Sequence, residues 1–156
     1  MGLDMYLSAR QSFYANDALS HGIERERNEA IRSLFVELND FKTGNLDYVT
    51  VEIEAGYWRK ANEIHAWFVA NAQDGEDNCG NYYVGRDKLK ELKKLCEDVL
   101  NDNSKASELL PTQSGFFFGS TEYDQYYFDD LKHTIEIINR CLALPDNWSF
   151  SYHSSW

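Results

Sequence analysis

The sequence lacks long apolar runs. Its 156 residues contain no stretch near the ~18 consecutive apolar residues of a membrane span, and the run at 66–70 is typical of its short apolar segments. No charged and then apolar leader opens the chain. We therefore expect a protein of the cytoplasm that has no association with a membrane.

Cysteine is scarce. Cys79, Cys96 and Cys141 are widely spaced and form no Cys-x-x-Cys pair. An odd and scattered set of this kind excludes a disulfide scaffold and a zinc knuckle. Because Cys96 and Cys141 fall within apolar helical patterns, we expect both to be small buried hydrophobic side chains.

The motifs of common enzymes are missing as well. The sequence holds no G-x-S-x-G elbow, no P-loop lysine motif and no Rossmann glycine fingerprint. His21, His133 and His153 have no partner at metal-binding spacing. We therefore expect no metal and no cofactor, and we favour a binding protein over an enzyme.

Positive charge is in short supply. Fifteen Lys and Arg residues stand against 26 Asp and Glu residues, and the resulting net charge of −11 is spread along the chain. Because a surface of this sign repels phosphate backbones, broad binding of DNA or RNA is excluded. A basic protein surface and a small anion held in a local pocket remain as partners.

What the sequence does contain is enough apolar side chain for a core, at 43% hydrophobic residues. Alternating segments predict strands at 3–7, 48–54, 82–84 and 148–153, and the phenylalanine run 116–118 predicts a fifth, buried strand. Apolar stripes predict helices at 23–38, 58–72, 86–102 and from 120 or 121 to 144. Residues 11–22 are polar and predict a loop.

Alternation in the strands implies that one face of the sheet is solvated. We therefore expect one α+β domain over residues 1–156, with a mixed or largely antiparallel sheet of about five short strands and about four helices. The first helix would bury a stripe formed by Ile23, Arg27, Ile31, Leu34 and Leu38.

The most unusual local pattern is Tyr57-Trp58-Arg59-Lys60, between Gly56 and Asn62. If the strand ends at Gly56, both cations fall in the first turn of the next helix, where the macrodipole disfavours them. Free amides, two cations and aromatic faces would together suit a phosphate or a nucleobase. The alternative is structural, with the aromatic rings in the core and the cations paired with Glu63 and neighbouring carboxylates.

A second candidate site is Gly119-Ser120-Thr121, between the predicted strand 116–118 and the last helix. Its amides and hydroxyls could hold an anion. Ser120 or Thr121 could equally be a plain helix cap, since Thr121 and Asp124 resemble a capping box. Asp124, Asp129 and Asp130 flank the same helix start, where the macrodipole favours carboxylates without any metal.

His65 follows Asn62 and Trp58 on the same face of the second predicted helix. It could therefore point into a pocket at the Tyr57–Asn62 corner as an acid, a base or a hydrogen-bond donor. The alternative is a buried histidine whose ring is fully hydrogen-bonded.

Aromatic residues make up 15% of the chain, too many for the interior of a small protein. Exposed tyrosine and tryptophan often mark an interface. The C-terminal strand 149–156 (SFSYHSSW) is therefore a candidate edge for pairing across a homodimer. The alternative is an aromatic-rich core with some exposed tyrosine.

Four segments together resemble a family of small proteins encoded by tailed phages and prophages. They are residues 1–7 (MGLDMYL), 56–62 (GYWRKAN, with Ile64, His65, Trp67 and Phe68 after it), 110–124 (LPTQSGFFFGSTEYD) and 154–156 (SSW). The likeness covers most of the chain, with 11–45 the least distinctive part. It carries over no catalytic residues, and it implies the cytoplasm of a bacterial host during infection.

These observations favour a phage accessory protein that is not an enzyme and that counters host defence by binding a host protein complex, as anti-CRISPR proteins do. The alternative is a protein that binds or sequesters a small molecule, such as a nucleotide signal. Its ligand-binding residues would be Tyr57, Trp58, Arg59, Lys60, Asn62, His65, Ser120 and Thr121. An unfamiliar enzyme that uses His65 is a third hypothesis.

Overall fold

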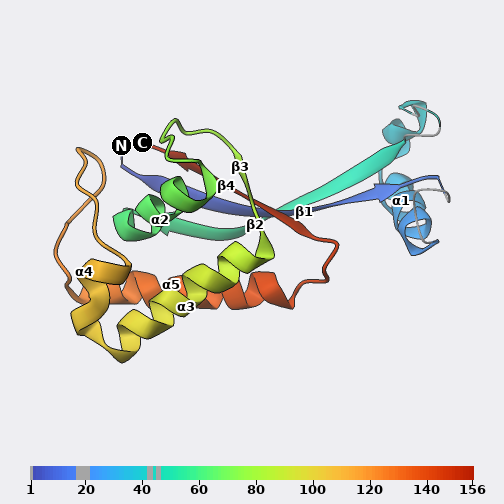
Figure 1. Ribbon diagram of the computed structural model, residues 1–156. Coiled ribbons are helices and arrows are strands. Elements are labelled where there is room, and N and C mark those ends of the chain that lie inside the picture. Colours follow the sequence, from blue (N-terminus) through green and yellow to red (C-terminus); the bar gives the residue numbers. More distant parts are fainter. Residues whose placement is uncertain (1, 17–21, 42–43, 45–46) are drawn as a thin grey trace. The chain divides into compact units, whose positions relative to one another are not determined.

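The computed structural model describes residues 2–16, 22–41, 44 and 47–156, which form an α+β fold. The chain divides into two compact units, unit 1 (Met1–Ala9 and Ile53–Trp156) and unit 2 (Arg10–Glu52). Two long strands, β1 (Asp4–Tyr14) and β2 (Tyr48–Arg59), run through both units (Figure 1). The expectation of one domain stays a prediction, and each unit is described by itself.

Four strands form an antiparallel sheet in the order β2-β1-β4-β3. β3 (Tyr82–Val84) pairs antiparallel with β4 (Ser149–Ser155), so that Tyr82 lies opposite Tyr152 and Val84 lies opposite Phe150. Both strands lie where the sequence predicts them. β4 lies between β1 and β3, so its residues 150–152, which pair with β3, are not an edge as predicted. Pairing of the C-terminal strand across a homodimer stays a prediction.

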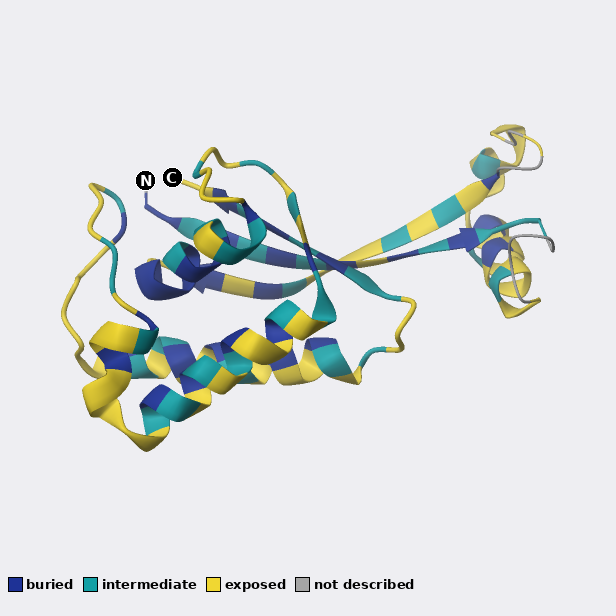
Figure 2. Cartoon of the chain, in the orientation of Figure 1, coloured by how far each residue is buried: buried dark blue, intermediate teal, exposed yellow. Residues whose placement is uncertain are grey.

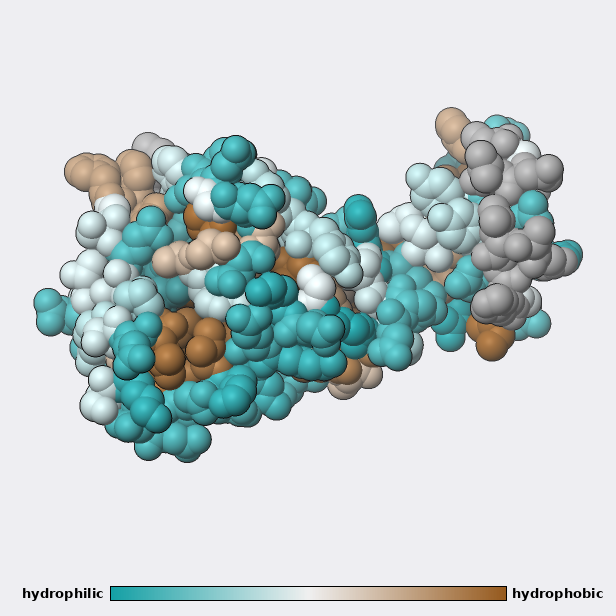
Figure 3. Space-filling view, in the orientation of Figure 1, coloured by the Kyte–Doolittle hydropathy of each residue, from teal (hydrophilic) through white to brown (hydrophobic). Residues whose placement is uncertain are grey.

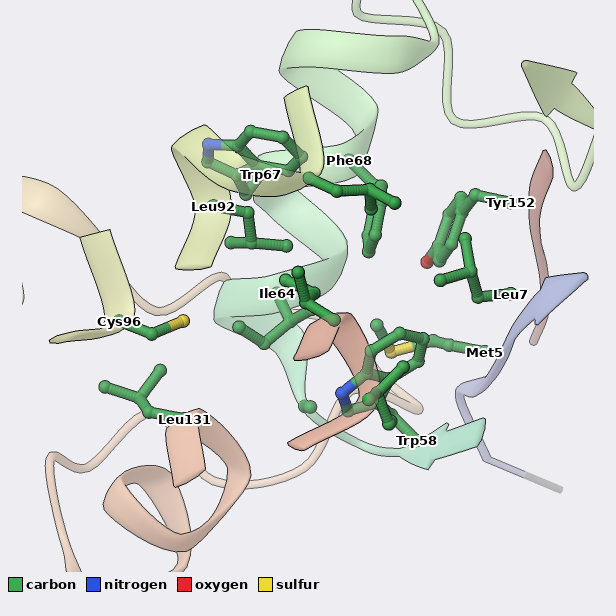
Figure 4. Packing of buried hydrophobic residues seen from close by; sticks show 14 of the residues in the cluster. Met5, Leu7, Trp58, Ile64, Trp67, Phe68, Leu92, Cys96, Leu131 and Tyr152 are labelled. Atoms are coloured by element: carbon green, nitrogen blue, oxygen red, sulfur yellow. The ribbon is translucent and has the colours of Figure 1, made fainter. Parts of the chain in front are cut away.

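The core of unit 1 lies between one sheet face and its helices. Leu3 just before β1, and Met5 and Leu7 within it, alternate along the chain and are fully buried. Figure 2 shows buried segments on the strands and on the helices of unit 1. On β4, the ring of Tyr152 stacks on Phe68, with ring centroids 4.0 Å apart and 10° between the planes (Figure 4). The strand period of two thus separates an apolar face from a partly polar one.

Three helices supply the other side of this core: α2 (Asn62–Ala72), α3 (Arg86–Asn101) and α5 (Gln125–Ala143). α3 and α5 pack against each other along their length (Figure 1). They are connected through a short 3-10 helix, η3 (Asn103–Lys105), and α4 (Ala106–Leu109). The buried cysteines Cys96 and Cys141 lie on α3 and α5, as predicted.

Gly56 allows α5 to approach β2. A Cβ atom at this position would stand 2.5 Å from Cγ2 of Ile137, which is too close for any side chain. Two residues further, the Nε1 of buried Trp58 donates a hydrogen bond to Oγ1 of Thr134 at 2.9 Å. Gly56 is therefore a packing position inside the strand, and the prediction that it ends the strand is wrong.

The opposite sheet face of unit 1 carries polar and aromatic side chains. The ring of Tyr6 stacks on His153 at 4.7 Å and lies 5.3 Å from the ring of Tyr57. Tyr57 donates its hydroxyl to Asp4 Oδ1 at 2.5 Å, and this bond to a carboxylate raises the pKa of the phenol. The expected partly solvated face is thus confirmed in unit 1.

Unit 2 contains α1 (Ile23–Leu34), the 3-10 helix η1 (Val36–Asp40) and the strand segments that complete β1 and β2. Its buried centre is polar. Arg32 donates to Asp47 Oδ1 at 2.5 Å and to Asn28 Oδ1 at 3.1 Å, and Asn28 donates to the Phe13 carbonyl at 2.7 Å. The predicted apolar stripe is wrong, because Asn28 and Arg32 are the buried residues of α1 while Ile23 and Leu34 are exposed.

Other boundaries differ from the sequence predictions. Residues 11–14 belong to β1, so the predicted loop 11–22 begins too early, and residues 17–21 of it lie outside the described residues. The sequence also predicts a turn at 41–45, with Gly44 in it, and residues 42, 43 and 45 of this segment lie outside the described residues. The predicted strand at 116–118 is wrong, because these residues form a turn and Phe116 is 95% exposed.

The surface of unit 1 in Figure 3 is largely hydrophilic on the face shown, with a hydrophobic patch enclosed by hydrophilic side chains. Hydrophobic side chains also gather at the tip of the loop between α4 and α5.

The described part of the chain contains no helix with the length and apolar character of a membrane span.

Candidate functional site

A pocket of about 450 Å³ lies in unit 1 where β2 ends and α2 begins. The loop between α4 and α5 and the first turns of α5 close it, and Figure 1 shows these segments at the same end of the unit. The residues that line it are Arg59, Lys60, Asn62, Glu63, Thr112, Gly119, Ser120, Glu122, Asp124, Tyr126, Tyr127 and Asp130. The two segments that the sequence singles out therefore share one cavity.

Asn62 joins the two segments. Its Nδ2 donates to the carbonyl oxygens of Phe118 at 3.1 Å and Ser120 at 2.8 Å, and its Oδ1 accepts from the backbone N–H of Gln113 at 2.8 Å. The side chain is buried, and three of its four hydrogen-bonding positions are used in this way. Asn62 is therefore a residue that shapes the pocket.

The backbone at this junction takes unusual conformations. Lys60 has a φ of 63°, in the left-handed region that a residue with a side chain rarely adopts. Two hydrogen bonds hold this conformation. The Lys60 N–H donates to the Leu3 carbonyl at 2.8 Å, and the Lys60 carbonyl accepts from the Asn62 N–H at 2.9 Å. β2 ends at this turn, and α2 begins at Asn62, four residues later than predicted. Arg59 and Lys60 therefore precede the helix.

Arg59 and Lys60 are exposed at the pocket and form no ion pair within the described residues. The alternative in which both cations pair with Glu63 is therefore wrong. Most other lysines of unit 1 do form pairs, such as Lys94 with Asp98 at 2.6 Å. The pocket thus has two positive groups that no carboxylate neutralises at contact distance.

Glu63 lies in the first turn of α2 and is only 3% exposed. Its Oε1 is buried and has no hydrogen-bond partner among the described residues. Burial, followed by the charges of Asp130 and Asp124, raises the pKa of Glu63 to about 8. At neutral pH its carboxyl group is therefore mainly protonated and can donate a hydrogen bond.

Asp124 and Asp130 come from the start of α5. Asp124 is the N-cap, and its Oδ1 accepts from the N–H groups of Tyr126 at 2.9 Å and Tyr127 at 3.2 Å. Burial raises the pKa of Asp130 to about 6, with His133 acting in the opposite direction. Two carboxyl groups with pKa values displaced upward, Glu63 and Asp130, therefore line one cavity, a pattern typical of functional sites.

Ser120 lines the pocket, whereas Thr121 is not among its lining residues. The Oγ of Ser120 accepts from the Glu122 N–H at 3.1 Å, and the Thr121 carbonyl accepts from Thr112 Oγ1 at 3.0 Å. Neither residue caps α5, which begins at Gln125. The predicted capping by Ser120 or Thr121 is therefore wrong.

Tyr57, Trp58 and His65 do not line this pocket. Tyr57 lies on the opposite sheet face, and Trp58 is part of the core. His65 is fully buried: its Nε2 bonds to Asp77 Oδ2 at 3.0 Å, and its Nδ1 lies 2.8 Å from the Tyr152 hydroxyl. Because a carboxylate can only accept, Nε2 carries the proton and Nδ1 accepts from Tyr152 in the neutral ring. His65 is therefore the buried, hydrogen-bonded histidine of the alternative interpretation.

Most of the acidic and aromatic residues that line the pocket are not predicted from the sequence as site residues. Glu63 has a recognisable signal, a carboxylate among the apolar residues Ala61, Ile64 and Phe68 of a buried helix. Asp124, Tyr127 and Asp130 are spaced three residues apart, which places them near one face of α5. Glu122, Tyr126 and Thr112 have no local pattern that marks them as pocket residues.

The described residues contain no group of three or more His, Cys, Asp or Glu side chains placed to hold a metal ion. The carboxylates of the pocket are therefore too spread for shared coordination of one ion. What the site offers is hydrogen bonding and charge: two cations, a neutral buried acid, carboxylates and two tyrosine rings.

Comparison with protein-family models, with curated proteins and with solved structures finds no match to this chain.

Proposed function

We propose that this protein binds a small molecule that carries an anionic group, in the pocket of unit 1. One observation carries the proposal: Arg59 and Lys60 line the cavity beside Ser120 and have no ion-pair partner in the described part of the chain. In a protein of net charge −11, these two groups are a local source of positive potential at one part of the cavity, while Glu63, Glu122, Asp124 and Asp130 make the rest of its charged lining acidic. An anion can therefore be attracted here although the surface as a whole repels it.

The cavity has the size of a small-molecule site. Its volume of about 450 Å³ lies within the range of ~300–1,000 Å³ that is usual for ligand pockets. Asn62 preforms the pocket, because its three hydrogen bonds fix the loop that carries Ser120. We propose that binding itself is the function, namely the sequestration of a small signal, with nucleotides among the candidates, in the cytoplasm of a bacterial host.

Thermal-shift measurements with inorganic phosphate, nucleotides and cyclic dinucleotides test this function. A ligand at about 100 times its Kd stabilises the folded state by ~2.7 kcal/mol. We expect Arg59→Ala to abolish the shift and Lys94→Ala to retain it, because Lys94 lies on α3 and is paired with Asp98. A panel in which no anion stabilises the protein would contradict the proposal.

Lys60→Gly separates binding from folding. Glycine adopts a φ of 63° without steric cost, so the substitution removes the charge and relaxes the backbone together. We expect unchanged or higher stability in urea and weaker anion binding. Asp74→Gly is the matched control, because Asp74 also has a positive φ, of 52°, and does not line the pocket.

A second function rests on exposed aromatic side chains. In unit 1, Phe116 is 95% exposed, Tyr126 is 80% exposed and Tyr83 is 71% exposed. Side chains of this kind are typical anchors of protein interfaces. They support the proposal of a phage accessory protein that binds and inhibits a host defence complex. The surface of that complex would be basic and would receive this acidic protein.

Capture of host proteins from a bacterial lysate at low salt tests this second function. We expect a specific protein to be retained by the wild type and lost with Phe116→Ser. Retention of no protein by the wild type would contradict it. Retention that Phe116→Ser leaves intact would exclude the loop between α4 and α5 as the contact.

A further inference from the structure

We infer that the ligand of this pocket is a zwitterion, with a positively charged amine or quaternary ammonium group in addition to the anionic group that Arg59 and Lys60 receive. The inference rests on the proposed function and adds a ligand class to it. It concerns the carboxylate wall, which we define as Glu63, Asp124 and Asp130.

The carboxylate wall lines the same cavity as the two cations but belongs to other elements. Glu63 comes from α2, while Asp124 and Asp130 come from the start of α5. No ion pair joins this wall to Arg59 or Lys60 in the described residues. The pocket therefore presents two separate sets of charge, and a bound molecule would meet both.

The independent observation that points to a ligand is the Oε1 of Glu63. This oxygen is buried on a side chain that lines the cavity, and it has no hydrogen-bond partner within the described residues. A buried polar atom left in this way costs free energy unless a ligand or water satisfies it. A positively charged group on a ligand would compensate this oxygen electrostatically, whether it carries an N–H donor, as an amine does, or none, as a quaternary ammonium group does.

The geometry favours an organic cation over a metal ion. The acidic groups are not clustered closely enough to hold a metal, whereas a larger ammonium group can contact several of them in turn. Tyr126 and Tyr127 also line the cavity, and aromatic rings attract organic cations through their faces. The inference therefore narrows the candidates of the proposed function, because a polyanion such as a nucleoside triphosphate would face the carboxylate wall with like charge.

Proton release is the expected consequence of binding. Glu63 is mainly protonated at neutral pH, since burial raises its pKa to about 8, and a bound cation favours its ionised form. The charged or titratable groups that face it are Asp124, Asp130 and Tyr127 from α5, Cys96 from α3, and Arg59, Lys60 and Glu122 around the cavity. Cation binding should therefore strengthen as the pH rises from 6 to 9.

Two probes of constant charge test the inference. Trimethyltaurine carries a sulfonate and a quaternary ammonium group, and ethanesulfonate carries the sulfonate alone. NMR titrations that follow the side-chain amide of Asn62 report binding at this pocket. At pH 9 we expect trimethyltaurine to bind about tenfold more tightly than ethanesulfonate.

Two variants distinguish the anion site from the proposed cation site at the carboxylate wall. Arg59→Ala should weaken both probes, whereas Glu63→Gln should weaken trimethyltaurine only and remove the rise of its affinity with pH. If both probes bind equally at pH 9, the zwitterion inference is wrong while the anion site stands. If neither probe shifts the Asn62 signal at any pH, the zwitterion inference is wrong, and the proposed function fails with it when no anion of the thermal-shift panel stabilises the protein either.

Discussion

Lys60 and Gly119, which both line the pocket, lie in close contact, and both have a positive φ. Lys60 has a φ of 63° and Gly119 a φ of 91°. A Cβ atom added to Gly119 would stand 3.1 Å from the Cβ of Lys60 and 3.4 Å from its carbonyl oxygen. The end of β2 and the loop before α5 therefore pack closely at this point, which leaves room for glycine at position 119 and little for a larger residue.

Gly119→Ala should separate these two segments. We expect a loss of about 1–2 kcal/mol in the free energy of unfolding from the left-handed conformation alone, a further loss from the contact with Lys60, and weaker anion binding. Gly75→Ala is the control, because Gly75 has a φ of 83° with open space around it. Urea unfolding and ligand titration of both variants are the measurements. Equal stability losses with unchanged binding would show that the contact does not shape the site.

Tyr152→Phe tests the assignment of His65 to the core. The substitution removes the hydroxyl that lies 2.8 Å from Nδ1 of His65 and leaves a buried nitrogen without its partner. We expect a loss of about 1–3 kcal/mol in the free energy of unfolding, with ligand affinity unchanged. Tyr83→Phe should leave stability unchanged, because the Tyr83 side chain is exposed. If Tyr152→Phe loses ligand binding without losing stability, His65 contributes to ligand binding and its assignment to the core is wrong.

Local patterns in the sequence predict much of unit 1. β3, α3 and β4 lie within about two residues of their predicted bounds, since strand alternation and helical stripes there agree with the burial that the fold imposes. The α+β class with a partly solvated sheet face follows from the same alternation. Prediction succeeds where one element buries one face against its neighbours.

Prediction fails where contacts distant in sequence decide the local structure. Gly56 resembles a strand end, yet the Ile137 side chain of α5 needs the space where its Cβ would be, and β2 continues to Arg59. In α1 the polar residues Arg32 and Asn28 are buried because each has a hydrogen-bond partner there: Arg32 donates to Asp47, and Asn28 donates to the Phe13 carbonyl. These partners lie 15 residues away along the chain, beyond any helical pattern.

The site itself was half predictable. Arg59, Lys60, Asn62 and Ser120 are brought together as the unusual composition of their segments suggests. Tyr57, Trp58 and His65 are not, because β2 extends through Trp58 and its strand period sends alternate side chains to opposite faces of the sheet. A helix beginning at Trp58 would have placed His65 near the cations.

Arg32→Ala should destabilise unit 2. Arg32 and Asp47 form a buried pair, and removal of one partner leaves an uncompensated charge that costs about 3–5 kcal/mol. Hydrogen exchange should show faster opening of α1, with protection in α3 and α5 retained. Lys94→Ala, which removes an exposed pair with Asp98 on α3, should cost less than about 0.5 kcal/mol. Equal effects of both variants would contradict the importance of the buried pair.

Glu63→Gln should change how stability depends on pH. The pKa of Glu63 is about 8 in the folded protein and ordinary in the unfolded chain, so between these values the folded state binds the extra proton. The contribution of Glu63 to the free energy of unfolding is therefore fully present below its pKa in the unfolded chain, and it is lost as the pH rises to about 8. Asp130 acts in the same direction but only to a pKa of about 6, which leaves the window from 6 to 8 to Glu63.

Urea unfolding of the wild type between pH 6 and pH 8 should show a decline of up to roughly 1.4 kcal/mol for each pH unit, and Glu63→Gln should remove most of it. The variant should consequently be more stable than the wild type above pH 8, where the buried carboxylate is charged. Glu136→Gln, at an exposed position of α5, should follow the wild-type curve. Parallel curves for the wild type and Glu63→Gln would mean that Glu63 is already ionised at neutral pH, and its role as a buried proton donor in the pocket would then be lost.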